Sequence, residues 1–285
     1  MKRLYKSLAL LLFVMLAGWQ ADAQEHHHFD EEEGLPLKIL HAEPLYIDLI
    51  RDLGARKGER EWNVGAALVD RKNYDSYEFL VEYEWAIIDR LGIELEVPVT
   101  LFSMPKTDEG ENASAVRPSN RVESLKMAAQ YTFLVSGKLQ TSLAIGGIVE
   151  WELTDFDHIS TRNAFEGVLF NPFFIAAKRW GPSWHSLIYT GPRITRHFYH
   201  SDWNYGYEIN TNIHYMIPDS RNFIGVEFNK IFDGKDFSMV IRPQMRVTLS
   251  ESTMIGIVPG IPVSRTNERL SAFVRLIYEP PHRRR

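Results

Sequence analysis

A two-residue alternation constrains this chain more than any other feature. In SYEFLVEYEWAIIDRLGIELEVPV, large apolar side chains take every second position and glutamates recur between them. A period of two predicts β-strands, because successive side chains of a strand point to opposite faces of the sheet. The resulting sheet has one large apolar face and one acidic face. The apolar positions are Tyr77, Phe79, Val81, Tyr83, Trp85, Ile87, Ile93, Leu95, Val97 and Val99.

The alternation continues almost to the C-terminus. Connections after even-numbered strands are tight (DRLG, VSGK, RWGPS, PDSRN and SES), whereas several after odd-numbered strands are longer. Short turns at one end and longer loops at the other are typical of outer-membrane barrels. About twelve strands are expected, near residues 61–69, 76–88, 91–101, 122–134, 138–152, 167–178, 184–196, 203–217, 222–231, 237–249, 253–262 and 269–279.

We therefore predict an all-β fold, a transmembrane antiparallel up-and-down barrel. Strands of ten or more residues match the tilted length that crosses a bilayer. The apolar face would contact lipid and the glutamates would face a polar lumen, and closure leaves no backbone edge in hydrocarbon. A soluble sandwich also alternates, but strand length, the charged second face and the placement of aromatics argue against it. The girdle candidates are Trp62, Tyr77, Trp85, Trp151, Tyr205, Tyr215, Phe237 and Tyr278.

The N-terminal 60 residues have a different composition. MKRLYK followed by SLALLLFVMLAG and Ala21-Asp22-Ala23 predicts a signal peptide over residues 1–23, cleaved after Ala23. Residues 24–60 form a His- and Glu-rich leader with a short amphipathic helix expected from Pro44 to Leu53, and residues 61–285 form the barrel. The helix would lie either in the periplasm or in the lumen, where four cationic residues would plug the acidic wall: Arg51, Arg56, Lys57 and Arg60.

Charged residues on the predicted inner face come from both early and late strands. In a closed cylinder the last strand pairs with the first, so an acidic and a basic wall would meet. Either these charges pair and hold a narrow barrel shut, or they filter solutes across a water-filled path. The candidate selectivity residues are Glu78, Glu82, Glu84, Glu94, Glu96, Glu150, Glu208, Arg193, Arg242, Arg246 and Arg275.

Several kinds of chemistry are disfavoured by composition. The chain has no cysteine, which excludes disulfides, thiolate metal sites and a cysteine nucleophile. A net charge of -5 without a basic patch gives no sign of a nucleic-acid partner. His26, His27 and His28 are only a weak metal candidate, because a solvated leader offers no fixed geometry. No cofactor is expected, and a closed barrel is expected to be a monomer in outer-membrane lipid.

The hairpin EYEWAIIDRLGIELEVPV resembles the repeated hairpin of outer-membrane barrels grouped with the MetA pathway of phenol degradation. Asp89, Arg90, Leu91 and Pro98 fit that pattern, whereas Ile88 stands where threonine is common. The resemblance covers Trp62 to Leu101. HAEPLYIDLIRDLGARKGEREWNVG is also similar to a segment of related Bacteroidetes-type barrels. These resemblances imply a bacterial outer-membrane location and a transport role, and they identify no cargo.

Passive passage of a small solute is the function that these features favour, with both termini in the periplasm. The alternative is a closed structural or adhesive barrel that acts through its loops at 102–121 and 153–166. An outer-membrane hydrolase is a third class, for which His200, Ser201 and Asp202 lie in one loop. Adjacent residues do not make a catalytic relay, since the base must be oriented toward the nucleophile by a third group. We therefore expect no enzyme.

Overall fold

The computed structural model describes residues 34–47, 49–103, 118–160, 162–199, 203–264 and 268–281. Twelve of its strands close into an antiparallel barrel, because each pairs with its neighbours, β13 pairs with β1, and β2 pairs with both β1 and β3. A two-residue strand, β4, adds to β3. The predicted fold class is confirmed. The described strands are β1 (Arg60–Arg71), β2 (Asp75–Ile88), β3 (Leu91–Phe102), β4 (Arg121–Val122), β5 (Ser124–Ser136), β6 (Thr141–Leu153), β7 (Phe165–Trp180), β8 (Trp184–His197), β9 (Trp203–Met216), β10 (Phe223–Asp233), β11 (Asp236–Ser250), β12 (Thr253–Pro262) and β13 (Glu268–Tyr278).

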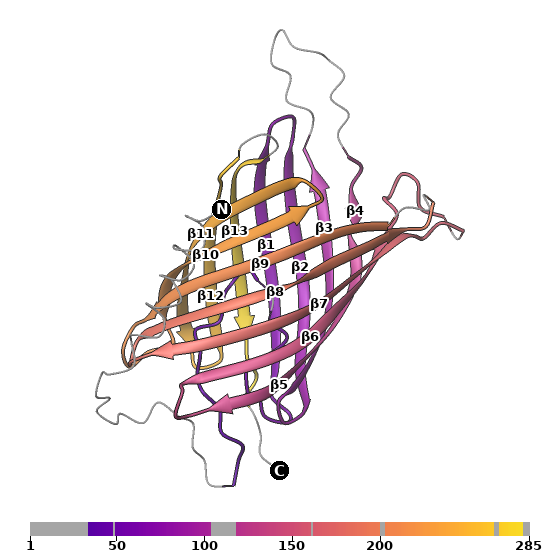
Figure 1. Ribbon diagram of the computed structural model, residues 1–285. Helices are drawn as coiled ribbons and strands as arrows, with labels where there is room; N and C mark the ends of the chain where they lie inside the picture. The colour runs from indigo at the N-terminus through magenta and orange to yellow at the C-terminus, as the bar shows by residue number, and fades with distance from the viewer. Residues whose placement is uncertain are drawn as a thin grey trace, which may run out of the picture.

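The two ends of the barrel differ in their connections. Strand β1 begins and β13 ends at the same end, here called the turn end, which lies at the bottom of Figure 1. The opposite end, here called the loop end, carries the long connections 103–120 and 154–164. The asymmetry that the sequence indicates is therefore present. The turn-end connections are residues 89–90, 137–140, 181–183, 217–222 and 251–252.

The alternation separates an apolar outer surface from an inner surface rich in charge. Val81 is 49% exposed on the outside, whereas the next residue, Glu82, is fully buried on the inside. Aromatic residues lie on the outer surface near both ends, with Trp62 and Trp184 at the turn end and Trp203 at the loop end. An apolar belt between two aromatic girdles is the surface that a bilayer requires.

Substitution on the two faces should have opposite outcomes. Val81→Arg places a cation in the middle of lipid-facing β2, at a cost of about 2–4 kcal/mol near the bilayer midplane. We expect it to block stable assembly. Glu82→Gln keeps the shape of an inward side chain that accepts a hydrogen bond from Asn63, and it should leave folding largely intact. Heat-modifiable gel mobility would measure the folded fraction of each variant. Equal folded fractions in the two variants would contradict the assignment of the faces.

Residues 34–47 and 49–59, called the plug segment below, enter from the turn end and continue inside the ring of strands as the indigo trace of Figure 1. The helix predicted over residues 44–53 is wrong, because the described residues there form bends and turns. Arg51 has a φ of 78°, which a right-handed helix does not accommodate. None of the described residues forms a helix long and apolar enough to span a bilayer.

Candidate functional site

Side chains of the barrel wall take the place of helical hydrogen bonds in the plug segment. A backbone amide buried without a partner is costly, so an irregular segment inside a barrel needs acceptors from its surroundings. Strands β5, β8, β10 and β11 each provide one. The described pairs are Ala42 N to His185 Nδ1 (3.0 Å), Leu45 N to Gln244 Oε1 (2.8 Å), Ile47 N to Glu227 Oε1 (3.0 Å) and Gly54 N to Thr132 Oγ1 (3.2 Å).

The turn between β2 and β3 holds the C-terminal part of the plug segment. The Asp89 carboxylate accepts a hydrogen bond from the backbone amide of Lys57 at 2.9 Å. At Gly92 the two backbones approach so closely that an added Cβ would lie 2.0 Å from the carbonyl oxygen of Ile50. The Asp-Arg-Leu-Gly turn noted in the sequence is therefore a docking point for the plug segment.

Apolar side chains of the plug segment pack against apolar residues on the inner wall. These contacts form two clusters, so the lumen is only partly polar at this depth. Burial of such side chains is the main non-directional force that keeps the segment in place. One cluster joins Ile47, Leu49, Ile50 and Leu53 to Ala128, Ala144, Ile148, Phe173, Ile175, Ala177, Leu187 and Tyr189. The other joins Ala42 and Leu45 to Phe223, Met254, Val258, Phe273 and Ile277.

A buried ion-pair network links the plug segment to the acidic wall. The guanidinium of Arg51 lies 2.6 Å from the Glu61 carboxylate and 3.5 Å from that of Glu84. Within the segment, the Lys38 ammonium lies 2.6 Å from Asp52. Arg51 is only 4% exposed, so its charge is compensated by these carboxylates rather than by bulk water.

The pKa values of two acids in the plug segment are shifted in opposite directions. Burial opposes ionisation of Asp52, but Lys38 and Arg51 outweigh it and hold the pKa of this carboxyl well below its usual range. Burial, together with the charge of Asp52, raises the pKa of Glu43 well above its usual range. Glu43 therefore holds its proton more tightly than Asp52 does.

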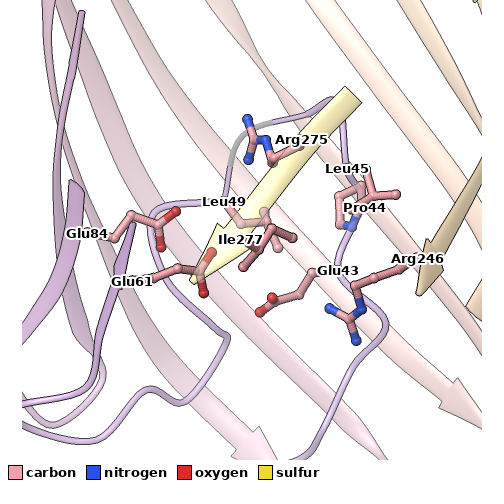
Figure 2. Close-up of a pocket in the computed structure, with 9 residues that line it drawn as sticks. All are labelled: Glu43, Pro44, Leu45, Leu49, Glu61, Glu84, Arg246, Arg275 and Ile277. Atoms are coloured by element: carbon pink, nitrogen blue, oxygen red, sulfur yellow. The ribbon is translucent and has the colours of Figure 1, made fainter. Parts of the chain in front are cut away.

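A small cavity lies between the plug segment and the wall at the turn end. Figure 2 shows Glu43 of the plug segment facing Glu61 and Glu84 of the wall, with Arg246 and Arg275 on the other sides. The cavity that they enclose measures about 20 Å³. Such a volume holds roughly one water molecule, so it offers no path for a solute.

Three buried carboxylates come together on β2 and β3 above the network of Arg51. Oxygens of Glu82, Glu94 and Glu96 lie within 4.8 Å of one another, a grouping compatible with a bound cation. Protein cations already compensate them. The Lys126 ammonium lies 3.2 Å from Glu94 and 2.9 Å from Glu96, and the Arg275 guanidinium lies 3.5 Å from Glu82.

A larger cavity of about 410 Å³, here called the vestibule, lies on the loop-end side of the plug segment. Its size is within the usual range for small-molecule sites. Tyr46 contributes the only side chain that the described plug segment presents to it. The vestibule lining has an apolar part, which includes Tyr46, Leu80 and Phe273, and a charged part, which consists of Glu78, Glu96, Glu123, Lys126 and Arg275.

The predicted selectivity residues all lie on inward-facing positions. Glu78, Glu150 and Arg193 are partly exposed, and the remaining eight are buried. Arg242 stacks on Tyr46, and Arg246 lies over Phe223. The sequence analysis did not predict that Arg242 and Arg246 lie close to the plug segment. The buried residues are Glu82, Glu84, Glu94, Glu96, Glu208, Arg242, Arg246 and Arg275.

Of the four cations predicted to form a plug, Arg51 contacts the acidic wall directly. Arg56 is buried and donates to the carbonyl oxygen of Pro36, whereas Lys57 and Arg60 are exposed. The candidate metal and hydrolase residues, 26–28 and 200–202, lie outside the described residues.

Sequence reasoning missed the neutral polar residues that bind the plug segment. His185, Gln244 and Thr132 occupy inward positions of their strands, so the alternation did carry a signal for them. The prediction considered only charged inward residues as functional. Neutral acceptors are nevertheless the groups that an irregular buried backbone requires.

A closed transmembrane barrel whose lumen contains an ordered N-terminal segment is the class of protein that this fold and site define. A family model described as HAEPLYID-like matches residues 37–279, and the chain belongs to that family. The eight letters of the family's name are residues 41–48 of this chain. The resemblance to the MetA-pathway group is not confirmed. No curated protein matches the sequence.

Solved structures support the fold at low sequence identity. An outer membrane channel from Pseudomonas putida F1 matches with a TM-score of 0.65 and 12% identity over 82% of this chain and 99% of that one. The NanC porin matches with a TM-score of 0.54 and 7% identity over 77% and 100%. The KdgM porin matches with a TM-score of 0.50 and 12% identity over 76% and 98%. At these identities the likeness shows the fold alone.

Proposed function

We propose that this protein is a monomeric, non-enzymatic channel of the bacterial outer membrane, in which the plug segment gates passive passage of a small solute. The observation that carries the proposal is the division of the lumen. Its turn-end half is filled by a segment of the chain itself, while its loop-end half contains an open vestibule. A purely structural barrel has no need for a vestibule above a separately held segment.

Three further features support this function. The plug segment is held by hydrogen bonds, ion pairs and packing, all of which can break without unfolding the barrel. The fold is shared with proteins that are named as a channel and porins. Short turns at the end where β1 begins and β13 ends are typical of the periplasmic side, so the plug segment would be reached from the periplasm. Inward charges such as Glu78 and Arg193 would then set selectivity.

A reversible crosslink between plug segment and wall tests gating directly. A Cβ added at Gly256 would lie 3.3 Å from Cγ of Leu45, a separation compatible with a Leu45→Cys/Gly256→Cys disulfide. The chain has no other cysteine. In a planar bilayer with increasing urea, the reduced protein should begin to conduct when the plug segment leaves, and the oxidised protein should stay silent.

Each single-cysteine variant is the matched control, since it cannot form the crosslink and should open under oxidising conditions. Equal conductance of the oxidised and reduced double variant would mean that ions pass with the plug segment in place, which contradicts gating. If neither form conducts while gel mobility shows a folded barrel, the closed structural or adhesive alternative is the better description.

A further inference from the structure

The apolar side of the vestibule is a tightly packed surface. A Cβ added at Gly65 would lie 2.7 Å from the Phe273 ring and 2.8 Å from Cγ of Leu80, so these two side chains cover β1 without a gap. Both belong to strands of the rigid barrel, β13 and β2. The surface therefore exists before any solute arrives and would lose little conformational entropy on binding one.

Tyr46 adds an aromatic ring to this side. It is 39% exposed, although Leu45 and Ile47 beside it are 2% and 6% exposed. The Arg242 guanidinium lies 3.3 Å from the centre of its ring, and the Phe273 ring meets it edge-on at 5.8 Å. The ring is thus fixed in position while part of its surface faces the vestibule.

Carboxylates gather at the loop-end rim of the vestibule. Glu78 and Glu123 line the vestibule, and Glu268 of β13 lies opposite Arg71 of β1, which pairs with Glu78. The side chains of Glu78 and Glu123 are 37% and 38% exposed, and their arginine partners, Arg71 and Arg121, are 3.5 Å and 3.4 Å away without lining the vestibule. Oε1 of Glu268 is buried with no hydrogen-bond partner among the described residues.

The cations that line the vestibule are already engaged by other carboxylates. The Lys126 ammonium lies between Glu94 and Glu96, and Arg275 points toward Glu82. The vestibule lining contains three carboxylates, Glu78, Glu96 and Glu123, and two cations, so its formal charge is negative. A cationic group placed at the rim would donate charge-assisted hydrogen bonds to the carboxylates of Glu78 and Glu123.

We infer that the vestibule binds an organic ammonium compound with a compact apolar body. The ammonium group would lie between Glu78 and Glu123, and the apolar body would lie against Tyr46, Leu80 and Phe273. This inference rests on the proposed function, because it names the class of solute that the channel admits. Contact with Tyr46 would also give the bound solute direct access to the plug segment.

Four probes separate the contributions of charge and apolar body. Calorimetric titration of the full folded chain in detergent would use phenethylammonium, phenethyl alcohol, phenylpropionate and methylammonium. We expect phenethylammonium to bind most tightly, because only it satisfies both sides of the vestibule. Equal affinity for the first three probes, or tightest binding of phenylpropionate, would overturn the inference.

Variants of the rim locate the ammonium group. Glu78→Gln and Glu123→Gln should each weaken phenethylammonium binding about tenfold, the effect of one lost charge-assisted hydrogen bond, and leave phenethyl alcohol unaffected. Glu152→Gln is the matched control, since Glu152 is an inward carboxylate near the same end that lies 3.6 Å from His197 and does not line the vestibule. Equal loss in all three variants would contradict a rim site.

Conductance separates this inference from the function on which it rests. A chain that conducts when its plug segment is released but binds none of the probes overturns the inference alone. A chain that binds phenethylammonium but never conducts overturns the channel and leaves the binding site in place.

Discussion

Removal of residues 24–59 is expected to convert a silent barrel into a conducting one. The described plug segment leaves a cavity of only about 20 Å³ beside it at the turn end, so its loss should open the lumen from end to end. Single-channel recordings in planar bilayers should change from background to steady conductance steps. The open lumen should prefer cations, because Glu61 and Glu84 lose the compensating charge of Arg51.

The deletion is designed to keep the barrel intact. It ends before Arg60, so the pairing of Arg60 with Trp85 and the rest of the β1–β2 register are retained. Heat-modifiable gel mobility would verify folding before any recording. A folded but silent barrel would contradict the proposal, since the inner apolar residues would then close the lumen without the plug segment, as a closed scaffold requires.

The barrel was predictable because a period of two is a local property. Val81 and Glu82 take opposite faces whatever lies elsewhere in the chain. The same rule applied to every strand, together with strand length and the alternation of short turns and longer loops, indicates a closed barrel. The conformation of the plug segment was not predictable in this way. The amide of Leu45 bonds to Gln244, 199 residues away, so the group that replaces a helical hydrogen bond leaves no local trace.

One local signal for the plug segment was present and overlooked. Residues 172–177 of β7 read PFFIAA, which breaks the alternation of apolar and polar positions. Phe173, Ile175 and Ala177 are buried inside the barrel, whereas Phe174 between them is 37% exposed on the outside. A strand that is apolar on both faces is covered on both faces. Here lipid would cover one face, and the plug segment covers the other.

Arg51→Met is expected to release the plug segment. Arg51 is almost fully buried against Glu61 and Glu84, and removal of one partner from a buried ion pair costs about 3–5 kcal/mol because the remaining charge is left uncompensated. Methionine keeps an unbranched apolar stem and has the same difficulty with a φ of 78°, so the difference reports the loss of the guanidinium group. In a chain without other cysteines, labelling of Leu45→Cys measures release, and it should occur at much lower urea in the variant.

Two controls show whether the ion pair is the cause. Lys57→Met removes an exposed cation from the same segment and should not change the urea at which Leu45→Cys is labelled. Adding Glu61→Gln and Glu84→Gln to Arg51→Met should recover part of the lost stability, because no unpaired charge then remains buried. If Leu45→Cys is labelled at the same urea concentration with and without Arg51→Met, then hydrogen bonds and the two apolar clusters hold the plug segment without help from charge. Gating would then depend on the polar acceptors of the wall, Gln244 above all, rather than on the acidic strands.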